Sequence, residues 1–128
     1  MPKDSGIGAS VKRREDVRFL TGRGRYTDDL NRPGQTHVHF LRSDVAHGRI
    51  RSLDTATAAG MPGVIRVLTG DDFRDKGSIP CGWQVTDREG NPMKEPRHPI
   101  LAEDFVRHVG DPVAAVVAET HAQARDAA

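Results

Sequence analysis

The stretch LRSDVAHGRIRSLDTATAAGMPGVIRVLTGDD, residues 41–72, carries the clearest succession of secondary-structure signals in the chain. Its residues 49–54 alternate apolar and polar side chains, a pattern that predicts a strand. Asp54 and Thr55 come next, and either residue can cap a helix through its side-chain oxygen. Residues 55–61 are rich in alanine and predict a short helix, which must pack on another surface because so short a helix is not stable alone.

The second half of this stretch predicts the end of the helix and a second strand after it. Pro62 cannot continue a helix, and Gly63 reverses the chain at little cost. Residues 64–68 are rich in β-branched side chains and predict a strand, and residues 69–72 open a turn or a short helix. The stretch therefore predicts a strand–helix–strand framework, and none of its residues is an obvious catalyst.

The C-terminal part of the sequence predicts two further strands and a helix. Residues 105–109 and 112–118 read as strands joined by a tight turn at Gly110-Asp111, which predicts a hairpin. Residues 113–118 do not alternate, a pattern typical of a strand that is buried on both faces. Glu119-Thr120 then caps a predicted helix at residues 121–128, which is rich in alanine.

A strand is also predicted upstream, at residues 35–42, after the turn signal Asn31-Arg32-Pro33-Gly34. It places Val38 and Phe40 on one face, and His37, His39 and Leu41 on the other. Two histidines on one strand face have a legitimate spacing for zinc, but a zinc site needs further ligands and none is tightly linked to this pair. We expect ordinary surface histidines. Asp28-Asp29 point to opposite sides of an extended chain, so a capping or turn role is expected rather than a paired-carboxylate site.

Residues 76–99 lose all periodicity and contain four prolines and three glycines, so they predict a long loop or a small hairpin pair with a reversal at residues 87–91. The only cysteine, Cys81, and the only tryptophan, Trp83, lie here. No histidine is near enough in sequence to activate the thiol, so we expect Cys81 to be a packing or bystander residue. We expect Trp83 to anchor the loop to the domain or to a partner.

Two signals for nucleotide or nucleic-acid binding are weak. Residues 21–26, TGRGRY, contain G-x-G but lack the third glycine and the preceding strand of a dinucleotide fingerprint. Residues 1–51 carry 11 Lys/Arg against 6 Asp/Glu, a charge of +5, whereas residues 52–128 carry 8 against 12, a charge of −4. The basic residues are interleaved with acidic ones and few aromatics, so a solvated face or a subunit contact is expected.

Length and composition are those of a single small domain of 128 residues. The longest apolar run, residues 113–118, is far too short to span a bilayer, and the start lacks the apolar core of a signal peptide. One cysteine excludes an internal disulfide and an iron–sulfur site built from this chain alone. We expect a cytoplasmic protein with a flexible tail at residues 1–10 and one domain at residues 11–128.

Several segments together resemble one known domain. They are GASVKRREDVRFLTGRGRYTDDLNRPGQTHVHFLRS from Gly8, AHGRIRSLD from Ala46, PGVIRVLTGDD from Pro62, PILAEDFVRHVGDPVAAVVAET from Pro99, and QARDAA from Gln123. In this order they resemble the amino-terminal α/β hammerhead domain of the molybdenum-binding large subunit of aerobic carbon monoxide dehydrogenases, within the xanthine dehydrogenase and aldehyde oxidase group. The resemblance covers most of the chain from Gly8 onward and is weakest at residues 76–99.

The resemblance implies an α/β fold of the α+β type, a mixed and strongly curved sheet with short helices. It implies a structural domain of an oxidoreductase whose molybdopterin cofactor, active-site loop and general-base glutamate belong to later domains. We therefore expect no catalytic, cofactor-binding or metal-binding residue in this chain, and no activity of the chain alone.

The expected partners are the later domains of the large subunit and the iron–sulfur and flavin subunits of the family complex. In the family the last helix is followed by another strand, so we expect a domain truncated before that strand and capable of self-association. Two alternatives stay open. One is a free-standing interaction module derived from this domain, and the other is a basic nucleic-acid-binding domain.

Overall fold

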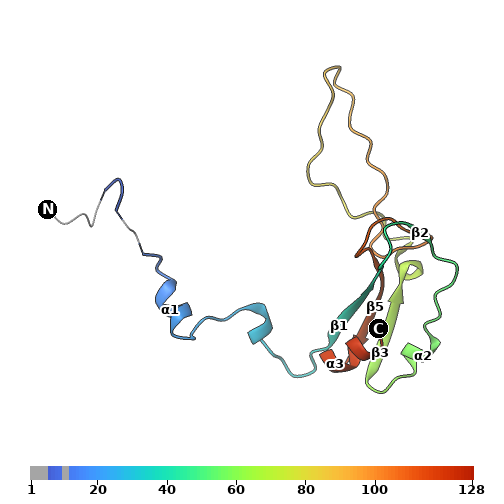
Figure 1. Ribbon diagram of the computed structural model, residues 1–128, viewed down its shortest axis with the longest axis horizontal. Coiled ribbons are helices and arrows are strands. Elements are labelled where there is room, and N and C mark those ends of the chain that lie inside the picture. The colour runs from blue at the N-terminus through green and yellow to red at the C-terminus, as the bar shows by residue number, and fades with distance from the viewer. Residues whose placement is uncertain (1–5, 10–11) are drawn as a thin grey trace. The chain divides into compact units, whose positions relative to one another are not determined.

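The computed structural model describes residues 6–9 and 12–128, and they form two compact units, Met1–Pro33 and Gly34–Ala128. Figure 1 shows the chain coloured from its N-terminus to its C-terminus. Most of the predicted tail, residues 1–5 and 10, lies outside the described residues. Within the tail, residues 6–9 form a turn in which the Ala9 amide donates to the Gly6 carbonyl at 3.2 Å.

The first unit contains helix α1, Asp16–Leu20, and a 3-10 turn η1, Thr27–Asp29. The ring of Tyr26 stacks on Phe19 with 5.6 Å between centroids, which ties the residue before the turn to the helix. The Asp29 carboxylate accepts a hydrogen bond from the Tyr26 amide at 2.8 Å. The predicted capping role of the Asp28-Asp29 pair is therefore confirmed at Asp29.

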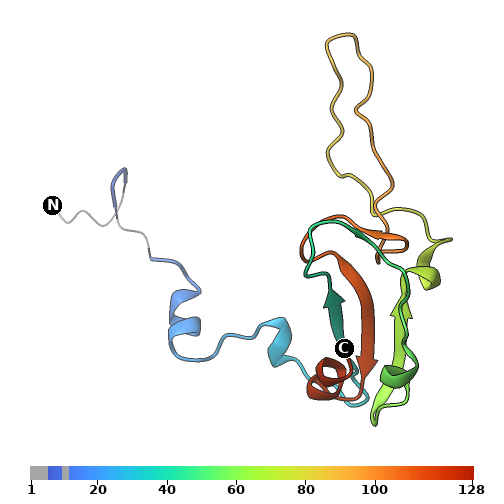
Figure 2. The same cartoon turned by 45° about the vertical axis from the view of Figure 1, so that its right-hand side comes forward.

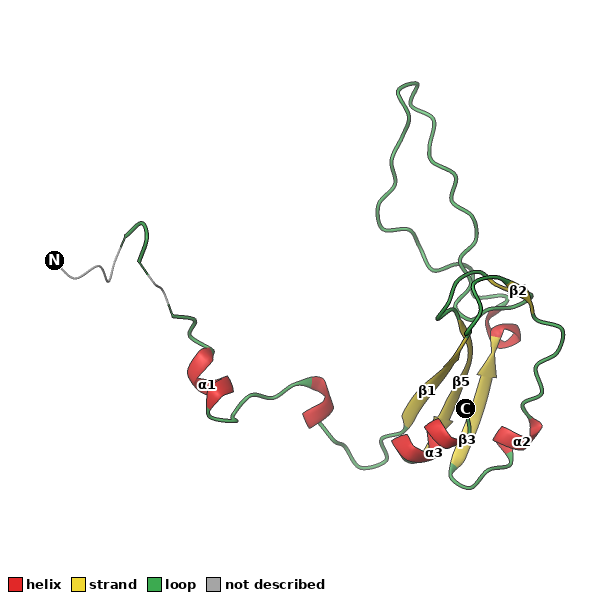
Figure 3. Ribbon diagram, in the orientation of Figure 1, coloured by secondary structure: helices red, strands yellow, loops and turns green. Residues whose placement is uncertain are grey.

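The second unit is built on a sheet of three strands, β1 His37–Arg42, β3 Val64–Thr69 and β5 Pro112–Ala118. Their order is β1-β5-β3, and β5 runs antiparallel to both neighbours (Figures 1 and 3). Because β5 is central, four of its residues are buried, as the unbroken apolar run predicts: Ala114, Ala115, Val116 and Ala118.

The predicted fold class, a curved sheet with short helices, is confirmed, although the described strands pair only antiparallel rather than in mixed directions. The pairing register shifts between Leu41 and Arg42 and again between Val64 and Arg66. Such irregularities bend a strand and increase its twist. Figure 2 shows β5 visibly bent along its length.

A second, two-stranded sheet pairs β2, Gly48–Arg49, with β4, Phe105–Val106. The predicted hairpin between residues 105–109 and 112–118 is therefore wrong, and the strand predicted at residues 49–54 is much shorter. Both edges of β5 are already paired with β1 and β3, so β4 has no free edge there.

The chain between β4 and β5 is held against a different part of the fold. The buried Asp111 carboxylate accepts a hydrogen bond from the Arg107 amide at 2.8 Å. The Ser43 amide donates to the Asp111 carbonyl at 2.9 Å, and the Gly110 amide donates to the Ser43 carbonyl at 2.7 Å. Gly110 has a φ of +89°, as the predicted tight turn requires. The turn is confirmed, but the strands that it joins belong to different sheets.

Three short helical elements lie at the predicted positions: α2 Ala56–Ala59, η2 Gly70–Phe73 and α3 His121–Asp126. The Asp54 carboxylate accepts the Ala56 amide at 2.9 Å before α2, and the Thr120 hydroxyl accepts the Gln123 amide at 3.2 Å at the start of α3. Within residues 6–9 and 12–128 the structure contains no helix with the length and apolar character that crossing a membrane requires.

The core of the second unit is small. Leu101 and Val116 are its largest fully buried side chains, with 1% and 2% of their surface exposed, and the other buried apolar residues are Ala102, Val106, Ala114, Ala115, Ala118 and Ala124. Helix α3 lies against the face of the sheet that carries His37 and His39. On the opposite face, Val38 and Phe40 remain 45% and 43% exposed.

Candidate functional site

The most distinctive feature of the second unit is a long excursion that we call the arm, residues 78–98 (Figures 1 and 3). Hydrogen bonds join its two limbs at the base, along their length and at the tip. The Ile79 amide donates to the His98 carbonyl at 2.8 Å, and the Asp87 amide donates to the Asn91 carbonyl at 3.0 Å. The predicted reversal at residues 87–91 is confirmed. The prolines of the arm lack amide donors, which explains why one isolated bridge, Thr86 to Pro92, replaces a regular ladder.

An ion cluster clamps the base of the arm to the domain. The Arg97 guanidinium donates to both Glu103 oxygens at 2.6 and 2.7 Å, a bidentate geometry typical of strong ion pairs. Arg97 also donates to the Arg74 carbonyl at 3.2 Å. The Arg74 side chain in turn binds Asp71 at 2.6 Å and Asp104 at 3.1 Å.

The electrostatics of this cluster suit a structural role. Hydrogen bonds from Arg97 hold the pKa of Glu103 below its usual value, and the same bonds raise the pKa of Arg97. Hydrogen bonds to Asp71 and Asp104 raise the pKa of Arg74. These shifts keep Glu103, Arg97 and Arg74 charged at neutral pH, whereas a general acid or base needs a pKa near the working pH. The cluster therefore positions the arm rather than moving protons.

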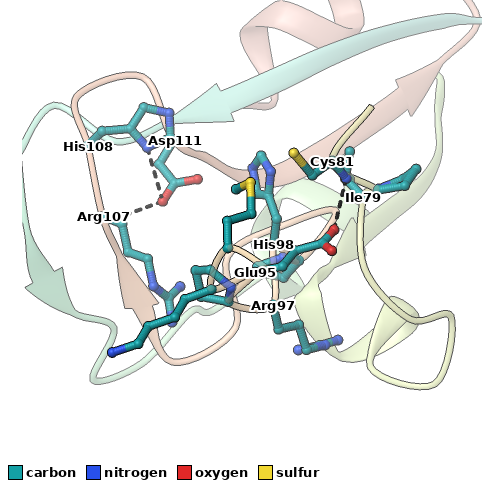
Figure 4. A pocket seen from close by; sticks show the side chains of 13 residues that line it. Ile79, Cys81, Glu95, Arg97, His98, Arg107, His108 and Asp111 are labelled. Atoms are coloured by element: carbon teal, nitrogen blue, oxygen red, sulfur yellow. Dashed lines mark hydrogen bonds and ion pairs between the residues drawn. The ribbon is translucent and has the colours of Figure 1, made fainter. Parts of the chain in front are cut away.

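A cleft of about 410 Å³ lies between the limbs of the arm and the turn that precedes β5 (Figure 4). Most of its wall is apolar, and it includes Ile79, Pro80, Met93, Pro96 and Pro99. Figure 4 shows Asp111 and His108 on one side of the cleft and Cys81 and Ile79 on the other. A cleft of this size and lining is typical of binding sites.

Both carboxylates of the cleft already have hydrogen-bond donors. The Glu95 side chain accepts the Cys81 amide at 3.0 Å and the Gln84 amide group at 2.6 Å, which links the two limbs of the arm. Asp111 is engaged by the Arg107 amide, with the His108 ring nitrogen 3.6 Å away. Both carboxylates therefore already hold local structure, Glu95 within the arm and Asp111 within the turn that precedes β5.

The two unusual residues of the arm are both exposed. The Cys81 thiol donates to the Trp83 carbonyl at 3.2 Å, so it is engaged by the backbone rather than by a base. The expectation that Cys81 is a bystander stays a prediction. Trp83 is 80% exposed. Of the two roles expected for Trp83, packing onto its own domain is wrong for the described residues, and contact with a partner stays a prediction.

The structure brings a third histidine to the pair on β1. The ring of His121, at the start of α3, lies 6.1 Å from the ring of His37 and 6.3 Å from that of His39, measured between centroids. No set of three or more His, Cys, Asp or Glu side chains in residues 6–9 and 12–128 has a geometry that could hold a metal ion. The expectation of no metal site stays a prediction.

The second glycine of the G-x-G segment has a packing explanation. A β-carbon on Gly24 would lie 2.7 Å from the ring of Phe19, too close for a real side chain. This glycine therefore makes room for the stacked Phe19 and Tyr26 rings, and no phosphate needs to be invoked for it. Sequence reasoning missed this role because the clash arises only once the ring pair has formed.

Comparison with known proteins identifies the domain. The family model described as "Aldehyde oxidase and xanthine dehydrogenase, a/b hammerhead domain" matches residues 21–128. The large subunit of nicotine 6-hydroxylase from Paenarthrobacter nicotinovorans is 45% identical over 122 residues, which cover 94% of this chain and 14% of that subunit. The carbon monoxide dehydrogenase large chain of Afipia carboxidovorans is 47% identical over 72 residues, 56% of this chain and 9% of that chain.

Among solved structures, the crystal structure of quinoline 2-oxidoreductase from Pseudomonas putida 86 matches with a TM-score of 0.76 and 46% identity. This match covers 94% of the present chain and 15% of the quinoline enzyme's chain. The present chain thus spans about one seventh of the relatives that it matches along its length. It belongs to the aldehyde oxidase and xanthine dehydrogenase family of molybdopterin-dependent hydroxylase large subunits, as their a/b hammerhead domain.

Proposed function

We propose that this chain is a non-catalytic scaffold domain in the large subunit of a molybdenum hydroxylase, and that the complete enzyme oxidises a nitrogen-containing aromatic ring. The observation that carries the substrate class is the extent of similarity. Identity of 45–46% extends over 94% of the chain for enzymes named for nicotine and quinoline. Over a similar share of the chain, carbon monoxide dehydrogenases are 34–36% identical.

The residues of this chain do not fit the molybdopterin cofactor of the family. Such a cofactor is anionic and needs many hydrogen-bond donors and a coordination position for its metal. The cleft beside the arm is lined mainly by apolar surface, its free cationic groups are Lys94 and Arg107 alone, and no set of three or more His, Cys, Asp or Glu side chains in residues 6–9 and 12–128 could hold a metal ion. We therefore place the cofactor in parts of the large subunit beyond these 128 residues, and no reaction step is assigned to this chain.

The proposed role of the domain is to pack against the rest of the large subunit. Val38 and Phe40 project from the sheet face opposite α3 and remain nearly half exposed, and Ile65 on β3 is 56% exposed. Exposed apolar surface of this kind marks interaction sites in soluble proteins. The further partners that we propose are iron–sulfur and flavin subunits, and the support is that the similar nicotine and carbon monoxide enzymes are named as the large subunit or large chain of their enzymes.

The substrate class is tested on the complete enzyme complex. We would measure dye-linked oxidation of quinoline, nicotine, an aliphatic aldehyde and carbon monoxide by the same preparation, with molybdenum content determined in parallel. We expect kcat/KM to be highest for the nitrogen-containing rings. A fully molybdenum-loaded complex that prefers carbon monoxide or the aldehyde would refute the proposed substrate class while leaving the scaffold role standing.

A further inference from the structure

The arm presents an unusual amount of apolar surface to solvent. Trp83 is 80% exposed, Val85 50%, Ile79 43% and Met93 38%, and all four lie within the same excursion. Aromatic and methionine side chains are enriched where proteins bind one another, and tryptophan is prominent among residues that dominate binding energy. Within the described residues, most of Trp83 and half of Val85 stay uncovered. The arm therefore has the composition of a binding element.

The arm is also ordered before any partner arrives. At its base the Ser78 hydroxyl accepts the His98 amide at 2.8 Å, beside the bidentate ion pair of Arg97 with Glu103. Further along, Glu95 ties the two limbs together through Cys81 and Gln84. A surface held in place in this way loses less conformational entropy when it binds than a mobile loop would. The cross-links thus favour docking of the arm as a unit.

Among the described residues, the charged groups of the cleft that still lack a side-chain partner are cationic. Its carboxylates, Glu95 and Asp111, keep their negative charge but already accept hydrogen bonds from neutral amide groups. Lys94 forms no ion pair with any residue in the described ranges, and the Arg107 guanidinium reaches only the Phe105 carbonyl, at 3.3 Å. Both cationic side chains line the cleft and are exposed. The complementary occupant is therefore apolar with at least one carboxylate.

We propose that the arm and its cleft form a docking site for an acidic, apolar segment of the same large subunit, from the part of that polypeptide outside these 128 residues. This inference rests on the proposed function. It favours a segment of the same subunit because the chain spans only 14–15% of its full-length relatives, so most of the subunit is available to supply it. A segment of that chemistry would cover Trp83 and place its carboxylate between Lys94 and Arg107.

Cys81 provides a direct probe, because it lines the cleft and is the only cysteine of these 128 residues. We would treat the 128-residue chain and the complete large subunit, each in native buffer, with a maleimide and monitor the Cys81 peptide by mass spectrometry. Docking predicts that labelling of Cys81 is at least about tenfold slower in the complete subunit, because the thiol reacts only when the segment opens.

Charge-reversed variants test the chemistry of the occupant. In the complete subunit, Lys94→Glu and Arg107→Glu should each speed labelling of Cys81 severalfold toward the rate of the 128-residue chain. Arg88→Glu, at the tip of the arm and outside the cleft, makes the same change of charge and should leave the rate unchanged. Circular dichroism of the variants in the 128-residue chain checks that each one folds.

The outcomes separate the docking site from the proposed function. Equal labelling of Cys81 in both proteins, or equal effects of the three variants, would overturn the docking site. Protection in the 128-residue chain that increases with its concentration would assign the cleft to a second copy and would also overturn it. Protection in a complete subunit that fails to oxidise nitrogen-containing rings would leave the docking site standing and reject the substrate class.

Discussion

Truncation of Val116 to alanine tests whether the central strand supplies the stability of the second unit. Val116 lies in the middle of β5 and is 2% exposed. The substitution removes two buried methyl groups, a loss of about 1.6 kcal/mol in transfer free energy at ~0.8 kcal/mol each. The cavity left behind adds to this, so we expect a total loss of about 2–3 kcal/mol. For a domain with so few buried large side chains, this is a substantial part of a total of about 5 kcal/mol.

Val38→Ala is the matched control, because it makes the same chemical change on a side chain that is 45% exposed. We expect it to cost less than about 1 kcal/mol in the 128-residue chain, since fewer contacts are lost. Urea unfolding should be monitored by far-ultraviolet circular dichroism rather than by fluorescence, because the only tryptophan, Trp83, lies on the exposed arm. Equal losses of unfolding free energy for Val116→Ala and Val38→Ala would refute the proposed core.

Three further predictions concern the turns, the ion cluster and the exposed surface. Gly110→Val should cost about 1–3 kcal/mol through strain at a φ of +89°, measured by urea unfolding, whereas Gly82→Val, where a β-carbon meets open space and φ is not positive, should cost little. The lowered pKa of Glu103 means that its contribution to stability is present above its usual pKa of 4.5 and is lost as the pH falls through the lower folded-state pKa. In urea unfolding curves measured over a pH series, Glu103→Gln should therefore reduce the loss of unfolding free energy at acid pH, and Glu89→Gln on the arm should not. The isolated chain should self-associate or be marginally stable because of its exposed apolar surface, so a concentration-independent, stable monomer in sedimentation would contradict this prediction.

Local signals in the sequence predicted the elements whose stability depends on neighbouring residues. Helix α2 ends at Ala59 with Gly60 as its C-cap, before the predicted stop at Pro62-Gly63, whereas Gly63 adopts a φ of +79° and the Thr120 hydroxyl caps α3 as predicted. The unbroken run at residues 113–118 correctly predicted a central strand, but burial on both faces is only partly confirmed: Ala114, Val116 and Ala118 are buried on one face, whereas on the other Ala115 is buried and Val113 and Val117 are half-buried. In each case the deciding interaction spans a few residues, so it is visible in the sequence.

Features that depend on distant residues could not be predicted in this way. The pairing of β4 with β2 instead of β5 results from the occupation of both edges of β5, which no local pattern records. The clamp between Arg97 and Glu103 joins two segments with no shared periodicity, and His121 meets His37 only after the sheet and α3 have packed. The family itself was predictable from the resemblance, but the extent of similarity to enzymes of nitrogen-containing rings was not.

The location of the cofactor is the central claim, and molybdenum content tests it most directly. We would express the 128-residue chain and the complete large subunit in the same cells, which make the cofactor, and measure molybdenum per polypeptide by elemental analysis. We predict near-stoichiometric molybdenum in the complete subunit, and background levels in the 128-residue chain, because its cleft is mainly apolar and its described residues contain no set of side chains that could hold a metal ion. Near-stoichiometric molybdenum in the 128-residue chain would contradict the assignment of this domain as a non-catalytic scaffold.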